Sequence, residues 1–414
     1  MSVLTDFDIA QDLKVEFFIP DESENIFIIG VSEIGGSDVL GGAGWFIIGE
    51  SLIGGPDVIT DGEFTFDWRN LACETSRVET SLGGSVQNAT YFQPMPGEAS
   101  IVLQSYTYDP TNNRTIRPGT GVRVRVSRGS LDEMLFRGYI NNINVSYTVE
   151  GLNLITITAF DSFSKVVNTR LELFDTVTNY PEGYASSYEV LEEVALGYGT
   201  SMNAQSVDDG GRVPGVLETD VIPNNFINDA IQVGLGFFWI DPATEEFVFI
   251  PRPGIGEVPL GVYTVGNNHS DPNHLCMSGI SISGDYNDVY NSLRVALTSD
   301  DAIYALRSDQ DSIDLYDIAA IDARINTTDI EQLNLWADKV FTQSPTHLVQ
   351  SVDTPAVNRL GNLTHAAQIL PGELIGVEYQ TSNMNINTYY SVVKVSHSIN
   401  SDTWFTTLEL WKEV

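Results

Sequence analysis

The sequence predicts a mainly β protein of several domains, in which two β-barrel domains flank a smaller α+β insertion. Between residues 62 and 170, apolar and polar residues alternate along short segments, and turn residues interrupt them every eight to twelve positions. Two helical patterns and a hairpin pattern follow within residues 171–260. Alternating segments return after a linker rich in Gly, Pro and Asn, about residues 254–275.

Residues 1–61 are expected to form a strand followed by a Gly-rich arm. The segment Phe27–Gly30 recurs as Phe46–Gly49, an offset of 19 residues (46 − 27). A period near 20 is typical of stacked units, but two copies are fewer than a solenoid requires. Two interpretations remain open: a pair of strand–loop units within one domain, or an arm that becomes ordered on a neighbouring subunit.

The first barrel domain is predicted over residues 62–170. Its clearest strand lies within residues 121–128, where valines and arginines alternate, so that one side faces a core and the other faces outward. The valines are Val122, Val124 and Val126, and the arginines between them are Arg123 and Arg125.

The mixed domain is predicted over residues 171–260, with two helices and a hairpin. Ser187–Gly197 is a predicted helix with Ser187 as its N-cap, and glycines follow at its end. Asn224–Gly234 is the second, with Asn224 or Asn225 as its cap. Two apolar segments joined by a turn at Asp241 then predict the hairpin.

The second barrel domain is predicted over residues 261–414, interrupted by a helical insertion at about 328–342. The helix is expected over Asp329–Phe341 with Thr328 as a candidate cap. Its apolar residues recur at helical spacing and define one face. They are Leu333, Trp336 and Val340.

Charge is the strongest compositional signal, because 56 acidic residues against 20 basic ones give the 414-residue chain a net charge of −36. Such a surface argues against nucleic-acid binding, which requires clustered Lys and Arg. The charge indicates either a solvated acidic surface or the lining of a channel through which DNA passes without binding. The sequence lacks an apolar run of membrane-spanning length and a signal peptide, so we expect folding in a cytoplasm. Cys73 and Cys276 are expected to be free thiols.

Several short motifs occur in an order that resembles the tail hub ("minor tail") proteins of long-tailed bacteriophages. They are the turn Arg117-Pro118-Gly119, the Val/Arg strand that follows it, Leu135–Tyr139, Ala159–Asp161, Asn291–Val295, Ser312–Tyr316, and the closing segments Val395–Ile399 and Trp404–Leu408. The resemblance covers about residues 62–414 and implies two tail-tube-like β-barrels.

This resemblance also implies a function. We expect a structural virion protein and not an enzyme: a homotrimeric hub at the distal end of the tail tube, assembled in the host cytoplasm. Three chains with two barrels each would match the sixfold tube, adapt it to a threefold tip and gate the DNA channel. The implied partners are other copies of the chain, the distal tail protein, the tape measure protein and further tip proteins. Two other functions remain open: a receptor- or carbohydrate-binding tail protein, and a tip-associated wall hydrolase.

A basic cluster is the candidate subunit interface, because five of the 20 basic residues fall within residues 114–128. The alternative is pairing with carboxylates on neighbouring strands of the same barrel. The cluster comprises Arg114, Arg117, Arg123, Arg125 and Arg128.

No nucleotide-binding loop or hydrolase motif is present in the sequence, so we expect no cofactor and no catalytic residues. Three acidic or mixed clusters have a default interpretation as solvated segments, with metal binding as the alternative. The first is His269, Asp271, His274 and Cys276; the second is Asp309, Asp311, Asp314 and Asp317, to which Asp208 and Asp209 add a third, shorter one. His397 is interpreted as a structural, partly buried histidine, and four tryptophans as core residues: Trp239, Trp336, Trp404 and Trp411.

Overall fold

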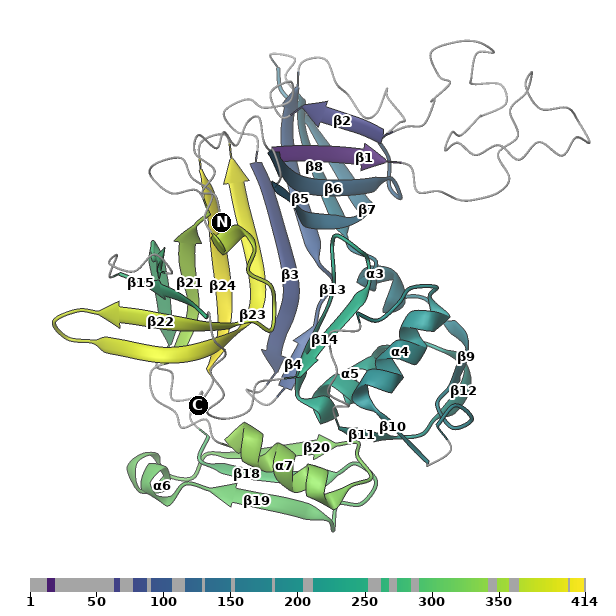
Figure 1. The fold of residues 1–414 in the computed structure, drawn as a ribbon, viewed down its shortest axis with the longest axis vertical. Coiled ribbons are helices and arrows are strands. Elements are labelled where there is room, and N and C mark those ends of the chain that lie inside the picture. Colours follow the sequence, from purple (N-terminus) through teal and green to yellow (C-terminus); the bar gives the residue numbers. More distant parts are fainter. Residues whose placement is uncertain are drawn as a thin grey trace, which may run out of the picture.

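In the structure, a computed structural model, most of the described residues lie in strands, and a few helices accompany them (Figure 1). The described residues are 13–18, 63–67, 77–87, 91–105, 116–128, 131–149, 153–180, 183–203, 211–251, 262–267, 274–283, 290–341, 348–356, 365–400 and 403–412. The Gly-rich repeat, Arg114, Cys73, Asp208, Asp209, His269 and Asp271 lie outside these residues.

The first β unit contains eight strands. They are β1 (Leu13–Phe18), β2 (Glu63–Asp67), β3 (Arg77–Gln87), β4 (Tyr91–Pro94), β5 (Glu98–Ser105), β6 (Gly121–Arg128), β7 (Leu131–Tyr147) and β8 (Asn153–Phe160). The second β unit comes from the far end of the chain. Its elements are β15 (Tyr263–Gly266), β16 (His274–Cys276), β17 (Gly279–Ser283), β21 (Leu348–Pro355), the short 3-10 helix η2 (His365–Ala367), β22 (Leu374–Gln380), β23 (Asn385–Asn400) and β24 (Trp404–Lys412).

Strand β3 joins the two β units into one continuous sheet. Its residues Arg77–Ser81 pair with β5 on one side, and Arg77–Gly83 pair with β23 on the other. The sheet therefore runs in the order β16-β15-β22-β23-β3-β5-β8-β7-β6-β1-β2, and β24, β21 and β17 extend it from β23. Figure 1 shows β3 between the β units at the top and the left of the molecule.

The turn that precedes β6 explains one motif of the first unit. The N–H of Thr120 donates to the carbonyl of Arg117 at 3.0 Å, and Gly119 has a φ of +90°. This is the geometry of a type II turn, in which Pro presets the second position and Gly adopts the positive φ of the third. The β6 valines that follow are fully buried, as the alternation predicted.

Gly138 has a different reason for being glycine. It lies on β7 within the motif Leu135–Tyr139, and a Cβ built on it would lie 2.2 Å from the carbonyl oxygen of Phe160 on β8. Because that contact is with main chain, no side-chain rotation would relieve it. Close packing of β7 against β8 therefore requires glycine at this position.

The mixed unit forms the right of Figure 1. Its elements are α3 (Phe163–Val166), β9 (Leu171–Asp175), β10 (Tyr184–Ser186), α4 (Ser187–Gly197), β11 (Arg212–Pro214), β12 (Leu217–Val221), α5 (Asn224–Gly234), β13 (Gly236–Ile240) and β14 (Phe247–Pro251). The two predicted long helices and the predicted hairpin are confirmed.

The predicted helix caps are wrong by one or two residues. Ser186, not Ser187, caps α4 through a capping box with Glu189, because Ser186 still has extended backbone. Pro223 occupies the N-cap position of α5 without a side-chain bond, and Asn224 and Asn225 lie inside the helix. A proline tolerates this place because the first helical N–H groups have no partner within the helix.

The insertion in the second β unit is larger than the predicted helix at about 328–342. Residues 290–341 form a separate sheet, β19-β18-β20, with one helix packed on it. Its elements are β18 (Ser292–Leu297), β19 (Tyr304–Ser308), α6 (Gln310–Tyr316), β20 (Ala320–Ile325) and α7 (Ile330–Phe341). At the start of α7 the carboxylate of Asp329, not Thr328, accepts the N–H of Glu331 at 2.8 Å. The apolar face of α7 is buried as predicted.

Three hydrophobic clusters account for the architecture. One fills the first β unit, and a second fills much of the second β unit. The largest combines the mixed unit with the inserted sheet and helix, so two segments separated by the strands β15–β17 share one core. The four tryptophans interpreted as core residues are all buried. Among the described residues, no helix has the length and apolar character needed to span a membrane.

Candidate functional site: a polar face shared by the two β units

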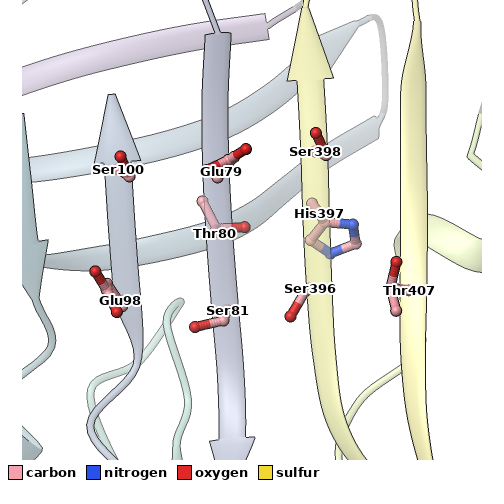
Figure 2. Close-up of a pocket in the computed structure, with 9 residues that line it drawn as sticks. All are labelled: Glu79, Thr80, Ser81, Glu98, Ser100, Ser396, His397, Ser398 and Thr407. Atoms are coloured by element: carbon pink, nitrogen blue, oxygen red, sulfur yellow. The ribbon is translucent and has the colours of Figure 1, made fainter. Parts of the chain in front are cut away.

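A polar face crosses the junction between the two β units on strands β5, β3, β23 and β24. Its outward residues lie in register, so that Glu98, Ser81, Ser396 and Thr407 form one row. Ser100, Glu79 and Ser398 form the next row. Figure 2 shows these side chains on neighbouring strands. They border a shallow depression of about 310 Å³.

The depression follows from residue size and strand alternation. On β3, β5 and β23 the residues that alternate with the outward ones are buried. Val78, Ile101 and Ile399 are apolar, whereas Thr80 and His397 are polar. Outward positions carry Ser, Thr and Glu, and the short hydroxyl side chains leave the main chain close to solvent. The result is a hydroxyl-rich surface that also carries the carboxylates of Glu79 and Glu98.

Carboxylates outnumber cations on this face. Glu79 lies 3.7 Å from Arg77, and Glu409 lies 3.5 Å from Lys394. In each pair at least one of the two side chains is exposed to solvent, so the ion pair contributes little to stability. Asp353 on β21 accepts the hydroxyl of Thr407 at 2.6 Å and extends the face by one strand. Asp353 and Glu98 are carboxylates in addition to these two ion pairs, so the face carries more acidic than basic side chains.

A buried polar row lies on the opposite side of the same strands. Thr80, His397, Thr406 and Thr354 are register partners on β3, β23, β24 and β21, and none is more than 6% exposed. The row separates the apolar cluster of the first β unit from that of the second. It marks the place where one core ends and the other begins.

His397 is held by two bonds to β24. Its Nδ1 lies 3.0 Å from the hydroxyl of Thr406 and accepts the indole N–H of Trp404 at 3.2 Å. An Nδ1 that accepts requires the neutral tautomer with its proton on Nε2. Burial lowers the pKa of His397 to about 4. The interpretation as a structural, buried histidine is therefore confirmed.

We expect His397 to make stability depend on pH. The unfolded state binds a proton on this residue near pH 6.5 and the folded state only near pH 4. Stability from this group is therefore lost as pH falls through that window, by up to about 3 kcal/mol. Asp161 and Glu373 act in the opposite direction, because burial raises the pKa of each carboxyl to about 7.

Comparing His397→Gln with the wild type cancels the contribution of these two acids. Urea denaturation should show that the variant costs more stability at pH 7 than at pH 4.5. An equal cost at both values would contradict the assignment.

The basic cluster lies elsewhere, on and before β6, and the sheet does not bring it to the polar face. Arg123 is the register partner of Glu16 on β1 and of Arg137 on β7. Arg125 pairs in register with Lys14 and Met134. Arg117 precedes β6 and Arg128 ends it.

The metal alternatives find no support among the described residues, which contain no group of three or more His, Cys, Asp or Glu that could hold a metal ion. His274 instead bonds Glu378 at 3.0 Å, and Cys276 is exposed. Asp309 caps α6 by accepting the N–H of Ser312 at 3.1 Å. Asp311, Asp314 and Asp317 are exposed, as expected for a solvated acidic segment.

Sequence reasoning did not identify the polar face. The alternation of Ser with apolar residues in β5 and β23 indicates an exposed strand face. This alternation does not show that β5 and β23 will pair with opposite edges of β3.

Comparison with known proteins was informative only for structure. No protein-family model matches the sequence, and no curated protein does either. The tail protein from Neisseria meningitidis MC58 superposes with a TM-score of 0.57 at 11% identity, over 86% of this chain and 95% of that one. A 43 kDa tail protein of prophage MuSo2 from Shewanella oneidensis superposes with a TM-score of 0.55 at 12% identity, over 82% and 94%.

This chain has the fold of phage tail proteins. The predicted fold class, mainly β with an α+β insertion, is confirmed. The tail-protein fold includes both β units and the elements between them, because each match spans more than four-fifths of this chain. No catalytic family is indicated by these neighbours.

Proposed function

We propose that this chain is a structural component of a phage tail: a homotrimeric hub at the distal end of the tail tube. The observation that carries the proposal is the continuous sheet through β3, which places two β units side by side with one shared polar face. Three such chains supply six β units, the number that a sixfold tube presents. The tail-protein fold supports this role.

In the proposed trimer the polar face lines the channel. Short hydroxyl side chains and a carboxylate excess give DNA no cluster of Lys or Arg to bind, so the duplex would slide past. The trimer carries 3 × −36, or −108 charges. Part of that charge would face the lumen and repel phosphates.

The remaining parts of the proposal concern position and partners. One end of the hub would meet the distal tail protein and the tape measure protein. The other would meet further tip proteins, converting sixfold to threefold symmetry and gating the channel. The hub would be located at the tip of the virion tail, and the tail would be assembled in the host cytoplasm.

Copy number per virion tests this function most directly. Quantitative mass spectrometry of purified virions, calibrated against the capsid protein, should give three copies. Six copies would indicate a ring protein and remove the argument from two β units. Absence from virions would overturn the structural role.

The basic cluster is proposed to contribute to the subunit interface. We expect Arg123→Glu combined with Arg125→Glu to weaken trimer assembly at least about tenfold, because like charges across an interface repel. Sedimentation equilibrium measures the effect. Arg170→Glu combined with Arg324→Glu is the matched control, since both residues form exposed ion pairs elsewhere. An unchanged oligomer in the β6 variant would remove this part of the proposal.

A further inference from the structure

A second hollow, distinct from the polar face, lies between the first β unit and the mixed unit. It has a volume of about 590 Å³, which is in the range of small-molecule sites. Its walls come from Tyr139 in the middle of β7, from α3 and the residue before it, from the segment after α4, and from the β13–β14 turn with the start of β14. We propose that this interdomain cleft binds a neutral saccharide. The proposal does not depend on the role of the chain in the tail tube.

The walls combine aromatic rings with hydroxyl groups. Tyr139 and Tyr198, which are both partly exposed, supply apolar surface against which the C–H face of a sugar ring can pack. Thr200, Ser201 and other hydroxyl residues line the rest. A sugar hydroxyl can donate to these oxygens, whereas a small apolar ligand would cover them without forming a hydrogen bond.

The hydrogen bonds already present in the cleft determine whether its hydroxyl groups can donate to a ligand or accept from it. The hydroxyl of Thr200 donates to the carbonyl of Glu245 at 2.9 Å, and that of Ser201 donates to the carboxylate of Glu246 at 2.9 Å. The hydroxyl of Tyr198 lies 2.6 Å from the carbonyl of Thr169. With their protons committed, these oxygens offer lone pairs, so the ligand must donate.

The cleft also contains a donor. The ammonium of Lys165 lies 3.5 Å from the centre of the Tyr139 ring and borders the hollow. An ammonium can only donate, so a ligand oxygen that reaches it can accept a hydrogen bond from it. A sugar hydroxyl both donates and accepts, and an acetamido carbonyl accepts strongly.

The electrostatics of the cleft favour a neutral ligand over an acidic one. The segment that directly follows the C-terminal end of α4 lines it, and this end of a helix carries partial negative charge. Glu245 and Glu246 lie on the facing turn, and Glu245 is bound to Arg137 at 2.7 Å. The net charge of −36 adds a general repulsion of anions.

The facing wall is held in an uncommon backbone conformation. Glu245 has a φ of +62°, although it is not glycine, and its N–H donates to the carbonyl of Asp241 at 2.8 Å. Such residues persist where surrounding contacts enforce them, and they concentrate at ligand sites. Here the conformation presents the Glu245 carboxylate to Arg137 and the Thr200 hydroxyl to the Glu245 carbonyl.

Isothermal titration and saturation-transfer NMR on the full chain test the site. The probes are maltose and N,N′-diacetylchitobiose, with glucuronic acid as the charged comparison. Ser162→Trp would fill the cleft, since Ser162 lines it and makes no side-chain cap bond in α3. Ser382→Trp, at the exposed tip between β22 and β23, is the matched control.

We expect at least one neutral disaccharide to bind with a millimolar Kd or tighter, and Ser162→Trp to weaken it at least about tenfold. Tyr139→Phe keeps the ring and the fold, and should weaken binding about threefold through loss of the hydroxyl. Ser382→Trp should bind like the wild type. Failure of both neutral probes to bind at about 20 mM would overturn the proposal. So would unchanged binding in both cleft variants, or tighter binding of glucuronic acid.

Discussion

Replacing Trp336 with alanine lowers the free energy of unfolding by about 3–5 kcal/mol and loosens the inserted unit first. Trp336 on α7 is fully buried, and its indole N–H donates to the carbonyl of Gln232 on α5 at 2.8 Å. The side chain of Gln232 in turn donates to the carbonyl of Arg324 on β20 at 2.9 Å. Alanine would leave a cavity in the shared core and would remove the shorter of two hydrogen bonds to the Gln232 carbonyl, which also accepts the N–H of Leu235 at 3.4 Å.

The neighbouring Leu335→Ala is the matched control, because that side chain is 48% exposed. It should cost less than about 1 kcal/mol in urea denaturation. Limited proteolysis should cut the Trp336 variant between residues 290 and 341 before any other part of the chain. Equal stability of the two variants would show that the inserted unit does not depend on this contact.

Replacing Trp404 with alanine should weaken the connection between the two β units, also at a cost of about 3–5 kcal/mol. Trp404 belongs to β24 in the second unit, yet it is buried in the core of the first. Its ring meets that of His397 edge-on with centres 5.7 Å apart, and its N–H bonds the same residue. Loss of the ring opens a cavity beside the buried polar row.

Hydrogen exchange locates the effect of this change. Amides of β23 and β24 near the pairing of His397 with Thr406 should exchange faster, while those of α4 and α5 should not change. Phe405→Ala, at the next residue, is the control, since Phe405 is 40% exposed on the other side of β24. A loss of stability no greater than that of Phe405→Ala would contradict the prediction.

Much of the fold could be predicted because its signals are local. The alternation of Val122 to Val126 predicts one buried side of β6, and Pro118-Gly119 predicts the turn before it. The helices α4, α5 and α7 follow from apolar residues at helical spacing. The caps were misplaced because Ser186 and Ser187 are equivalent by type, and only backbone conformation distinguishes them.

Long-range placement was decided by tertiary structure. Nothing local to β18, β19 or β20 indicates that they leave the second β unit and share a core with α5. The interdomain cleft depends on the same kind of contact, since its walls come from separate segments spread along the chain from Tyr139 to Phe247. Such contacts join segments that are far apart in the sequence, and no local residue pattern indicates which segments will meet.

By itself the sequence determined the β-rich class, the main helices, the acidic charge and a motif order that resembles phage tail hubs. Only the tertiary structure decided that β3 serves both β units and so creates the polar face. The physical reason is that a strand has two hydrogen-bonding edges. Alternation along β3 specifies which side chains face the core, but each edge is open to any strand whose register and packing fit.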